Sequence, residues 1–186
     1  AFDQRGHGKS GGKRGHTPSY DLLLDDISLL LKQADSLYPG APKFLYGHSM
    51  GGNLALNYAL KRKPNVAGVI SSSPWLKLAF EPPASKVKLA RMVNGIFPSL
   101  TQSSNLDASA ISRDTAVVNA YKNDKLVHDK ISSNMFLSVH ESGLWALEHA
   151  AEFQLPLLLF HGTADRLTSY KASDDFSRKV KGDITF

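Results

Sequence analysis

Residues 42–52, PKFLYGHSMGG, decide the fold of this chain. The run 42–46 is short, apolar and bounded by proline and glycine, which predicts a buried strand. The Leu- and Ala-rich run 53–61 predicts a helix. Ser49 therefore lies on a sharp turn that joins a strand to a helix, with one glycine two residues before it and another two residues after it.

The spacing G-x-S-x-G is what a serine nucleophile needs on such a turn. The turn brings backbone segments close together, and we expect Gly47 and Gly51 to remove Cβ atoms that would collide there. The strained backbone raises the Ser49 hydroxyl above the sheet, and the helix start contributes the positive end of its dipole. The N–H of Met50 then points to where an oxyanion forms. The alternative is a tight glycine-rich turn that only packs a helix onto a sheet.

Strands and helices alternate elsewhere in the chain as well. Further strands are predicted at 66–70 and 155–160, and further helices at 20–37 and 171–180. This rhythm is typical of βαβ units. The predicted fold class is therefore α/β, a three-layer sandwich with a mostly parallel sheet.

Residues 76–150 break this rhythm. They contain the pair Pro82-Pro83, helical patterns at 85–97 and 135–151, and a polar stretch between the two patterns. We expect an insertion over the sheet, a helical cap, and not a second independent domain.

The two ends of the chain read as parts of strands. Residues 1–3 resemble the end of a strand, and residues 183–186 resemble the beginning of one. We therefore expect residues 1–186 to form one partial domain, cut at both ends. A partial sheet with an unpaired apolar edge is expected to be poorly soluble or loosely folded.

Composition narrows the classes of function. The 186 residues are 42% hydrophobic, enough for a substantial core, and their net charge of +5 is spread along the chain, which disfavours a nucleic-acid site. Zero cysteines exclude a disulfide framework and a thiol nucleophile. A cytoplasmic or membrane-peripheral location is favoured. No metal or other cofactor is expected, because His140 and His149 are nine residues apart and match one helical face poorly.

A serine hydroxyl needs a histidine base, and that histidine needs a carboxylate to hold its tautomer. In this fold type the order along the chain is Ser, then Asp or Glu, then His. Asp165 follows the predicted strand 155–160, and catalytic groups gather at the carboxyl ends of parallel strands. Asp165 is therefore the predicted acid; the alternative is a turn or helix-capping aspartate.

The histidine base is the missing member of this set. All seven histidines precede Asp165. His161, at the end of the strand before the acid, is expected to be structural, and His48 is expected to pack beneath the turn. Residues 1–186 therefore hold two of the three members of a catalytic triad.

Three collinear motifs resemble the monoacylglycerol lipase and lysophospholipase branch of the α/β-hydrolase superfamily, the group of serine aminopeptidases S33. They are DQRGHGKS at 3–10, GHSMGG at 47–52 and HGTADR at 161–166. The resemblance implies that Ser49 is the nucleophile, Asp165 the acid and the Met50 N–H one oxyanion donor. It implies that the cap covers an acyl pocket and that Tyr121, within VNAYKND, contacts substrate.

The resemblance also implies parts that residues 1–186 do not contain. In the family an H-G-x-G-type loop before the first residue supplies a second oxyanion donor, and the triad histidine follows a strand that begins here at Ile184. We therefore expect the catalytic histidine beyond Phe186, and no esterase turnover from residues 1–186 alone.

The function predicted for the intact protein is hydrolysis of lipid esters, with monoacylglycerol as the first choice of substrate. Apolar cap residues either line an acyl channel or form ordinary cap core, and the cap also offers a surface for membrane association. These residues are Val87, Leu89, Met92, Val93, Ile96 and Phe97. The alternatives are a general carboxylesterase, lysophospholipase or peptidase of the same fold, and a non-catalytic fragment or pseudoenzyme.

Overall fold

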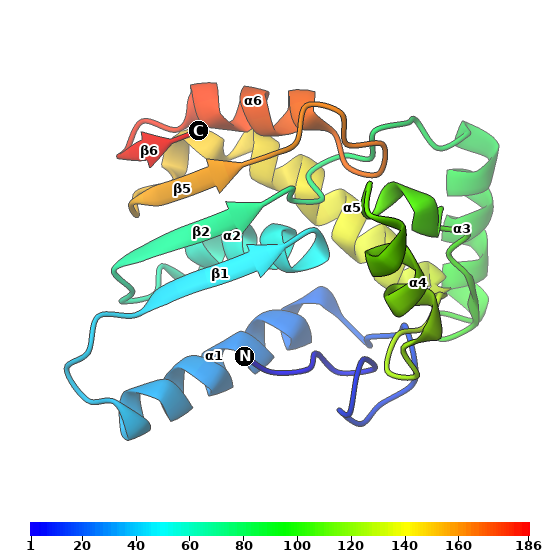
Figure 1. Cartoon of the computed structure of the whole chain (residues 1–186), viewed down its shortest axis with the longest axis horizontal. Helices are drawn as coiled ribbons and strands as arrows, with labels where there is room; N and C mark the ends of the chain where they lie inside the picture. Colours follow the sequence, from blue (N-terminus) through cyan, green and yellow to red (C-terminus); the bar gives the residue numbers. More distant parts are fainter. The chain divides into compact units, whose positions relative to one another are not determined.

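The structure is a computed structural model that describes all of residues 1–186. The chain divides into two compact units. Unit 1 contains residues 1–26 and 82–138, and unit 2 contains residues 27–81 and 139–186. Helices and strands follow one another in the order α1 (Tyr20–Leu37), β1 (Phe44–His48), α2 (Met50–Arg62), β2 (Gly68–Ser72), α3 (Ala84–Ile96), β3 (Thr101–Ser103), η1 (Ala108–Ala110), α4 (Thr115–Asn123), β4 (Lys130–Ser132), α5 (Ser133–Glu148), η2 (Ala150–Glu152), β5 (Leu157–Phe160), α6 (Tyr170–Lys179) and β6 (Ile184–Thr185) (Figure 1).

Unit 2 is built around a four-stranded sheet with the strand order β1-β2-β5-β6. Each strand pairs in parallel with its neighbour, so the predicted α/β class and parallel sheet are confirmed. The register aligns Tyr46 with Ile70 and Ile70 with Leu158. All four strands therefore run in one direction, and their carboxyl ends lie at the same edge of the sheet (Figure 1).

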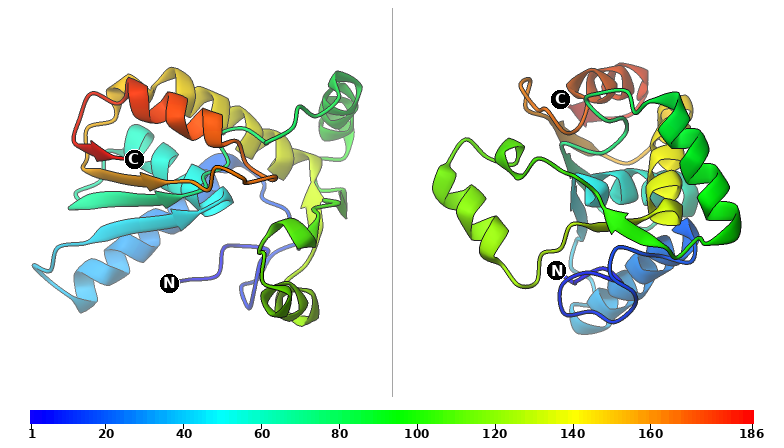
Figure 2. Two further views of the ribbon diagram at one scale, coloured as in Figure 1. Left: turned by 45° about the horizontal axis from the view of Figure 1, so that its top comes forward. Right: turned by 90° about the vertical axis from the view of Figure 1, so that its right-hand side faces the viewer.

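The strand order explains which face of the sheet the helices cover. Each connection from one strand to the next moves in the same direction across the sheet, and crossovers between parallel strands are right-handed. Helices on successive crossovers must then lie on the same face, and α2 and α6 do so (Figure 2). The predicted three-layer sandwich is thus seen only in part, because residues 1–186 place one helical layer on the sheet.

Burial along the strands agrees with one covered face. In β1 and β5 the residues alternate between buried and exposed, and the buried set includes Leu45, Leu157 and Leu159. The helices contribute Leu54, Leu56 and Phe176 to the same core. On the other face Tyr46 and Leu158 are exposed on either side of the half-buried Ile70. This in-register row leaves an apolar surface across three strands.

Unit 1 joins the first residues of the chain to the segment between β2 and α5. The Arg5 guanidinium binds both carboxylate oxygens of Asp26 at 2.7 and 2.6 Å, and His128 Nε2 donates to the Gly6 carbonyl at 2.8 Å. A Cβ on Gly15, whose φ is +69°, would strike the Lys130 carbonyl. The glycine-rich loop 3–16 therefore packs directly on the segment that precedes α5.

Several local predictions differ from the structure. The antiparallel pair β3 and β4 and helix α4 were not predicted; α4 begins where the Asp114 carboxylate accepts the Ala116 N–H. Residues 1–3 form no strand, since nothing pairs with them, whereas the strand beginning near 183–186 is confirmed as β6. None of the residues of α3 is buried, so of the two alternatives left open for its apolar residues, ordinary cap core is not the arrangement found.

The cap boundaries at 76 and 150 remain a prediction; residues 82–138 fall in unit 1, and 76–81 and 139–150 in unit 2. Every helix is too short or too polar to cross a membrane.

Candidate active site

Ser49 lies between β1 and α2 in a backbone conformation that L-residues rarely adopt. Its φ is 53° and its ψ is −116°, a strain that costs about 1–3 kcal/mol. Three hydrogen bonds hold it: the Ser49 N–H donates to the Ser72 carbonyl, and the Ser49 carbonyl accepts the N–H groups of Asn53 and Trp75, each at 3.0 Å. The predicted strand–serine–helix turn is therefore present.

The glycines around Ser49 have different roles. A Cβ on Gly47 would overlap the carbonyl group of Gly51, so only glycine fits at position 47. A Cβ on Gly51 would meet nothing within 4 Å, so the prediction that Gly51 also avoids a collision of its own is wrong. Gly52 is the second constrained position, because its Cβ would lie 2.8 Å from Ser71 Oγ and 3.0 Å from the Pro74 backbone.

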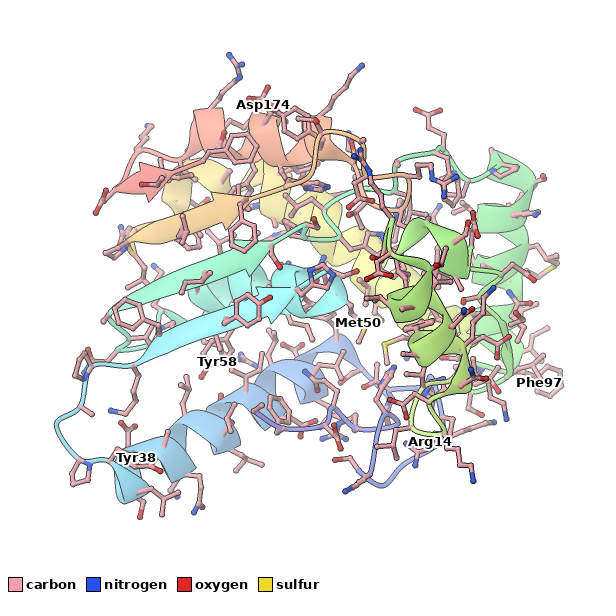
Figure 3. The ribbon with its side chains drawn as sticks, viewed as in Figure 1. Arg14, Tyr38, Met50, Tyr58, Phe97 and Asp174 are labelled. Carbon is pink, nitrogen blue, oxygen red and sulfur yellow. The ribbon has the colours of Figure 1, made fainter.

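Met50 is the first residue of α2, at the end of β1 (Figure 3). The N–H groups in the first turn of a helix have no carbonyl partner within the helix. The Met50 N–H therefore has no carbonyl partner within α2, and its role as an oxyanion donor remains a prediction.

Asp165 lies in the loop between β5 and α6, with its side chain 17% exposed. Its Oδ1 accepts the N–H groups of Leu167 at 2.8 Å and Thr168 at 3.0 Å. Its Oδ2 accepts the Thr168 hydroxyl at 2.9 Å and lies 3.3 Å from His161 Nε2. Ser169, not Asp165, caps α6, so the helix-capping alternative is not the arrangement found. The bonds from the N–H groups two and three residues further on are those of the turn aspartate that was the other alternative, and the role of Asp165 as the acid remains a prediction.

The surroundings of Asp165 favour its charged form. Burial by itself raises the pKa of the carboxyl, but hydrogen bonds from the Thr168 N–H, the Leu167 N–H and the Thr168 hydroxyl outweigh it, and the pKa falls below its usual 3.8. Burial lowers the pKa of His161 below 6.5, and the nearby carboxylate only partly opposes this. Near neutral pH the site therefore holds an ionised Asp165 beside a neutral His161.

Backbone and side-chain hydrogen bonds link the loops that follow β1, β2 and β5. The Ser73 N–H donates to the Phe160 carbonyl at 2.9 Å, and the Thr168 hydroxyl lies 3.2 Å from the Ser73 carbonyl. The bonds from Ser49 to Ser72 and Trp75 complete the series. Ser49 and Asp165 thus lie at the same edge of one sheet, on strands separated by β2.

The two histidines next to the site, His48 and His161, are both held by hydrogen-bond partners within the fold. His48 is exposed on the open face of the sheet, with Nδ1 2.8 Å from Ser72 Oγ, so the prediction that it packs beneath the turn is wrong. The reason is strand alternation, which points residue 48 away from the helical layer. His161 is fully buried at the side chain and contacts Ser173 and Thr168, as its predicted structural role requires.

The histidines of unit 1 are also engaged by neighbours. His7 stacks on His128 with ring centroids 4.9 Å apart, and His16 Nδ1 lies 3.0 Å from Ser132 Oγ. Tyr121 also belongs to unit 1, on α4, and is 36% exposed. Its role as a substrate contact remains a prediction.

Sequence reasoning missed the residues that hold Ser49 and Asp165 in place. Asn53 is completely buried, and its side-chain amide donates to the carbonyls of Trp75 at 2.8 Å and Val139 at 3.1 Å. Thr168 makes two hydrogen bonds to Asp165 and one contact with the Ser73 carbonyl, and it belongs to no motif that the sequence analysis recognised. The one sequence signal that could have identified such a supporting residue was Asn53, a polar residue at the start of an otherwise apolar helix.

Two features together are typical of an α/β hydrolase. They are a serine on a strained strand-to-helix turn of a parallel sheet, and a mostly buried aspartate in the loop that follows the strand two positions away. The chain belongs to the family described as serine aminopeptidase, S33, which it matches over residues 1–186. The predicted resemblance is confirmed, and the chain is similar to monoacylglycerol lipases within that family.

Similar proteins and structures support the same family assignment. The chain is 44% identical over 185 residues to an uncharacterized abhydrolase domain-containing protein of Dictyostelium discoideum, covering 99% of this chain and 19% of that protein. It is 34% identical to a monoacylglycerol lipase of Mycolicibacterium smegmatis, covering 90% of this chain and 60% of the lipase. The crystal structure of Paleococcus ferrophilus monoacylglycerol lipase superposes with a TM-score of 0.89 at 37% identity, over 100% of this chain and 71% of that one. The chain thus spans part of each relative's length.

The glycine geometry makes a paired prediction. Gly47→Ala should lower the free energy of unfolding by at least about 3 kcal/mol, because backbone atoms of Gly51 cannot move away without breaking the turn. Gly51→Ala should change it by no more than about 1 kcal/mol, since the space is open and alanine favours the helix. Urea unfolding of both variants measures the difference, and equal losses would contradict the geometry.

Asp165 predicts a pH dependence of stability. Because folding lowers its pKa, the unfolded chain takes up a proton more readily, so the stabilisation is present above the unfolded pKa of 3.8 and is lost as pH falls through the folded value. Asp165→Asn should therefore be less stable than the wild type near neutral pH and lose less stability on acidification. Urea unfolding at about pH 7, 5 and 3 tests this. Asp35→Asn, at a carboxylate that is 64% exposed, is the control. If the free energy of unfolding changed with pH in the same way in the wild type and in Asp165→Asn, the prediction for Asp165 would be wrong.

Proposed function

We propose that the protein carrying this chain is a serine hydrolase that cleaves carboxylic esters of lipids, with monoacylglycerol as the first candidate substrate. The observation that carries the proposal is the backbone of Ser49, held at φ 53° by hydrogen bonds to the end of β2, to the loop that follows β2 and to the first turn of α2. A turn that only packed a helix on a sheet would gain nothing from such strain. The resemblance to monoacylglycerol lipases supports the substrate class.

The chemistry follows from the positions of the groups. Ser49 Oγ attacks the ester carbonyl carbon while a histidine accepts its proton, and the Met50 N–H donates to the oxyanion. The histidine returns that proton to the departing alcohol, which leaves an acyl group on Ser49. Water then adds to the acyl carbon by the reverse proton transfers and releases the fatty acid.

The acid of this mechanism is Asp165. Its strand is two positions from that of Ser49, so the strand ends are roughly 10 Å apart. At that separation the two side chains can reach toward each other and hydrogen-bond the two nitrogens of one imidazole held between them. Neither of the two histidines beside the site suits this role, since the His161 side chain is buried and His48 faces away from the helical layer. The proposed base is a histidine outside residues 1–186.

The surface of α3 supports a lipid substrate. Leu89, Met92 and Ile96 recur at helical spacing and are exposed, Met92 by 60% and Ile96 by 66%. Phe97, at the end of the helix, points away from the ribbon (Figure 3). We propose that α3 forms part of a cap and that this stripe contacts the lipid surface that presents the substrate.

A peptidase of the same fold is the second candidate, favoured by the description of the family as serine aminopeptidase. The chemical steps on Ser49 are the same for an amide, so the substrate decides between the two. Hydrolysis of aminoacyl amides in preference to monoglycerides would select the peptidase.

Labelling tests the nucleophile. A fluorophosphonate probe should label the full-length protein at Ser49, and Ser49→Ala should abolish both labelling and ester hydrolysis. Asp165→Asn should keep the fold and lower kcat by about 10⁴-fold, because the base loses its tautomer and orientation. Asp175→Asn, on the exposed side of α6, is the matched control and should retain activity. Labelling that persists in Ser49→Ala would refute the assignment.

The apolar stripe of α3 makes a separate prediction about substrate. Replacing both Met92 and Ile96 with glutamate should lower turnover of a long-chain monoglyceride in phosphatidylcholine vesicles by about tenfold, a loss of about 1.4 kcal/mol of lipid contact. Turnover of a short soluble p-nitrophenyl ester should be unchanged. Arg91→Glu alters the net charge equally on another side of the helix and serves as the control. Indifference of the enzyme to chain length would refute the lipid proposal.

A further inference from the structure

His161 is a buried histidine that the catalytic steps above do not use. It follows β5 directly and lies four residues before Asp165 in the same loop. Its side chain is 0% exposed, whereas that of Asp165 is 17% exposed. A fully buried imidazole is costly unless both of its nitrogens have partners, so its partners define its state.

The partners of His161 determine its tautomer. Nε2 lies 3.2 Å from the Thr168 carbonyl and 3.3 Å from Asp165 Oδ2. Both of these oxygens only accept hydrogen bonds. The third neighbour of Nε2, the Thr168 hydroxyl at 3.3 Å, gives its hydrogen to the nearer Asp165 Oδ2, so Nε2 carries the proton. Nδ1 then accepts the hydroxyl of Ser173, 2.8 Å away and itself completely buried on α6. Since burial lowers the pKa of His161 below 6.5, the ring is neutral near pH 7, a donor at Nε2 and an acceptor at Nδ1.

The carboxylate of Asp165 is surrounded by donors of which none carries a full charge. Two backbone N–H groups hold Oδ1, and the Thr168 hydroxyl together with His161 Nε2 holds Oδ2. A lysine or arginine in place of His161 would orient the carboxylate equally well but would also neutralise it. A neutral donor fixes the rotamer and leaves the negative charge for the imidazolium that forms during catalysis.

We propose that His161 is a positioning residue, an Nε2-protonated neutral imidazole that fixes the orientation of Asp165 without cancelling its charge. This inference rests on the proposed role of Asp165 as the triad acid. It gives His161 a function in catalysis that acts through another residue, and it explains why a histidine occupies a position where an aliphatic side chain would be easier to bury.

Two substitutions of His161 distinguish the effect of losing the Nε2–H donor from the effect of losing side-chain volume. His161→Leu removes the Nε2–H and keeps an apolar side chain in place; His161→Gln restores an N–H donor near the position of Nε2. In the full-length protein we expect kcat to fall by about tenfold to a hundredfold in His161→Leu, as for a misplaced catalytic group, and to recover most of this loss in His161→Gln. His149→Leu, at the end of α5, is the matched control and should leave kcat unchanged.

A double-mutant cycle distinguishes positioning from a merely structural role. If His161 acts through Asp165, His161→Leu should change kcat by less than about twofold when Asp165→Asn is already present. A purely structural histidine would instead lower activity by the same factor in both backgrounds, which would overturn the proposal.

Nuclear magnetic resonance gives a readout that does not depend on activity. The ¹⁵N shifts of His161 should report a neutral ring protonated at Nε2, and the ¹³C titration of the Asp165 carboxyl should move to higher pH in His161→Leu but not in His161→Gln. A ring protonated at Nδ1, or an unchanged Asp165 titration in His161→Leu, would overturn the inference even if Ser49 is confirmed as the nucleophile.

If the NMR results were as expected but the probe did not label Ser49, only the hydrolase proposal would be refuted. If His161→Leu does not fold, the ¹⁵N shifts of His161 in the wild type remain the test, and a ring protonated at Nδ1 would overturn the inference.

Discussion

The handedness of parallel crossovers is the constraint on which the rest of unit 2 depends. Because the strands follow one another across the sheet as β1, β2, β5 and β6, every right-handed connection returns its helix to the same face. The same order puts the carboxyl ends of β1, β2 and β5 side by side at one edge. The helical layer, the open apolar face and the meeting of the Ser49 and Asp165 loops are therefore three results of one topological rule.

The site at this edge combines strain with hydrogen bonds that hold it. The backbone of Ser49 is unfavourable by itself, and it persists because Ser72, Asn53 and Trp75 each make a hydrogen bond to it. The buried amide of Asn53 in turn binds the Trp75 carbonyl, so the loop after β2 is fastened to the first turn of α2. In the proposed mechanism, rigidity of this kind holds the Ser49 hydroxyl and the Met50 N–H in place before substrate arrives.

Electrostatics divide the site between a charged and a neutral partner. Asp165 and His161 are close enough to form an ion pair, yet hydrogen bonds stabilise the carboxylate while burial keeps the imidazole neutral. The charge on Asp165 therefore remains available to a group on its exposed side. In a low-dielectric site an uncancelled charge acts strongly on a neighbouring histidine, which is why the environment of the acid matters as much as its identity.

Local signals by themselves determined much of this protein. The helix at 20–37 was predicted with its observed limits because its apolar period and the following Pro39-Gly40 are local signals. The strained strand-to-helix turn at Ser49 was predicted because the glycine spacing reflects a backbone requirement. Asp165 followed from its place after a strand. The missed helix α4 has a polar sequence whose start depends on a single capping carboxylate, at Asp114.

Only the tertiary structure decided which neighbours each of these residues has. It placed all helices of the sheet on one face, turned His48 to the open face, and showed that Gly47 is sterically required while Gly51 is not. It also surrounded Asp165 with Thr168 and His161. Sequence patterns record the preferences of a residue's own backbone and side chain, whereas contacts between loops of different strands depend on strand order and register, which no local pattern specifies.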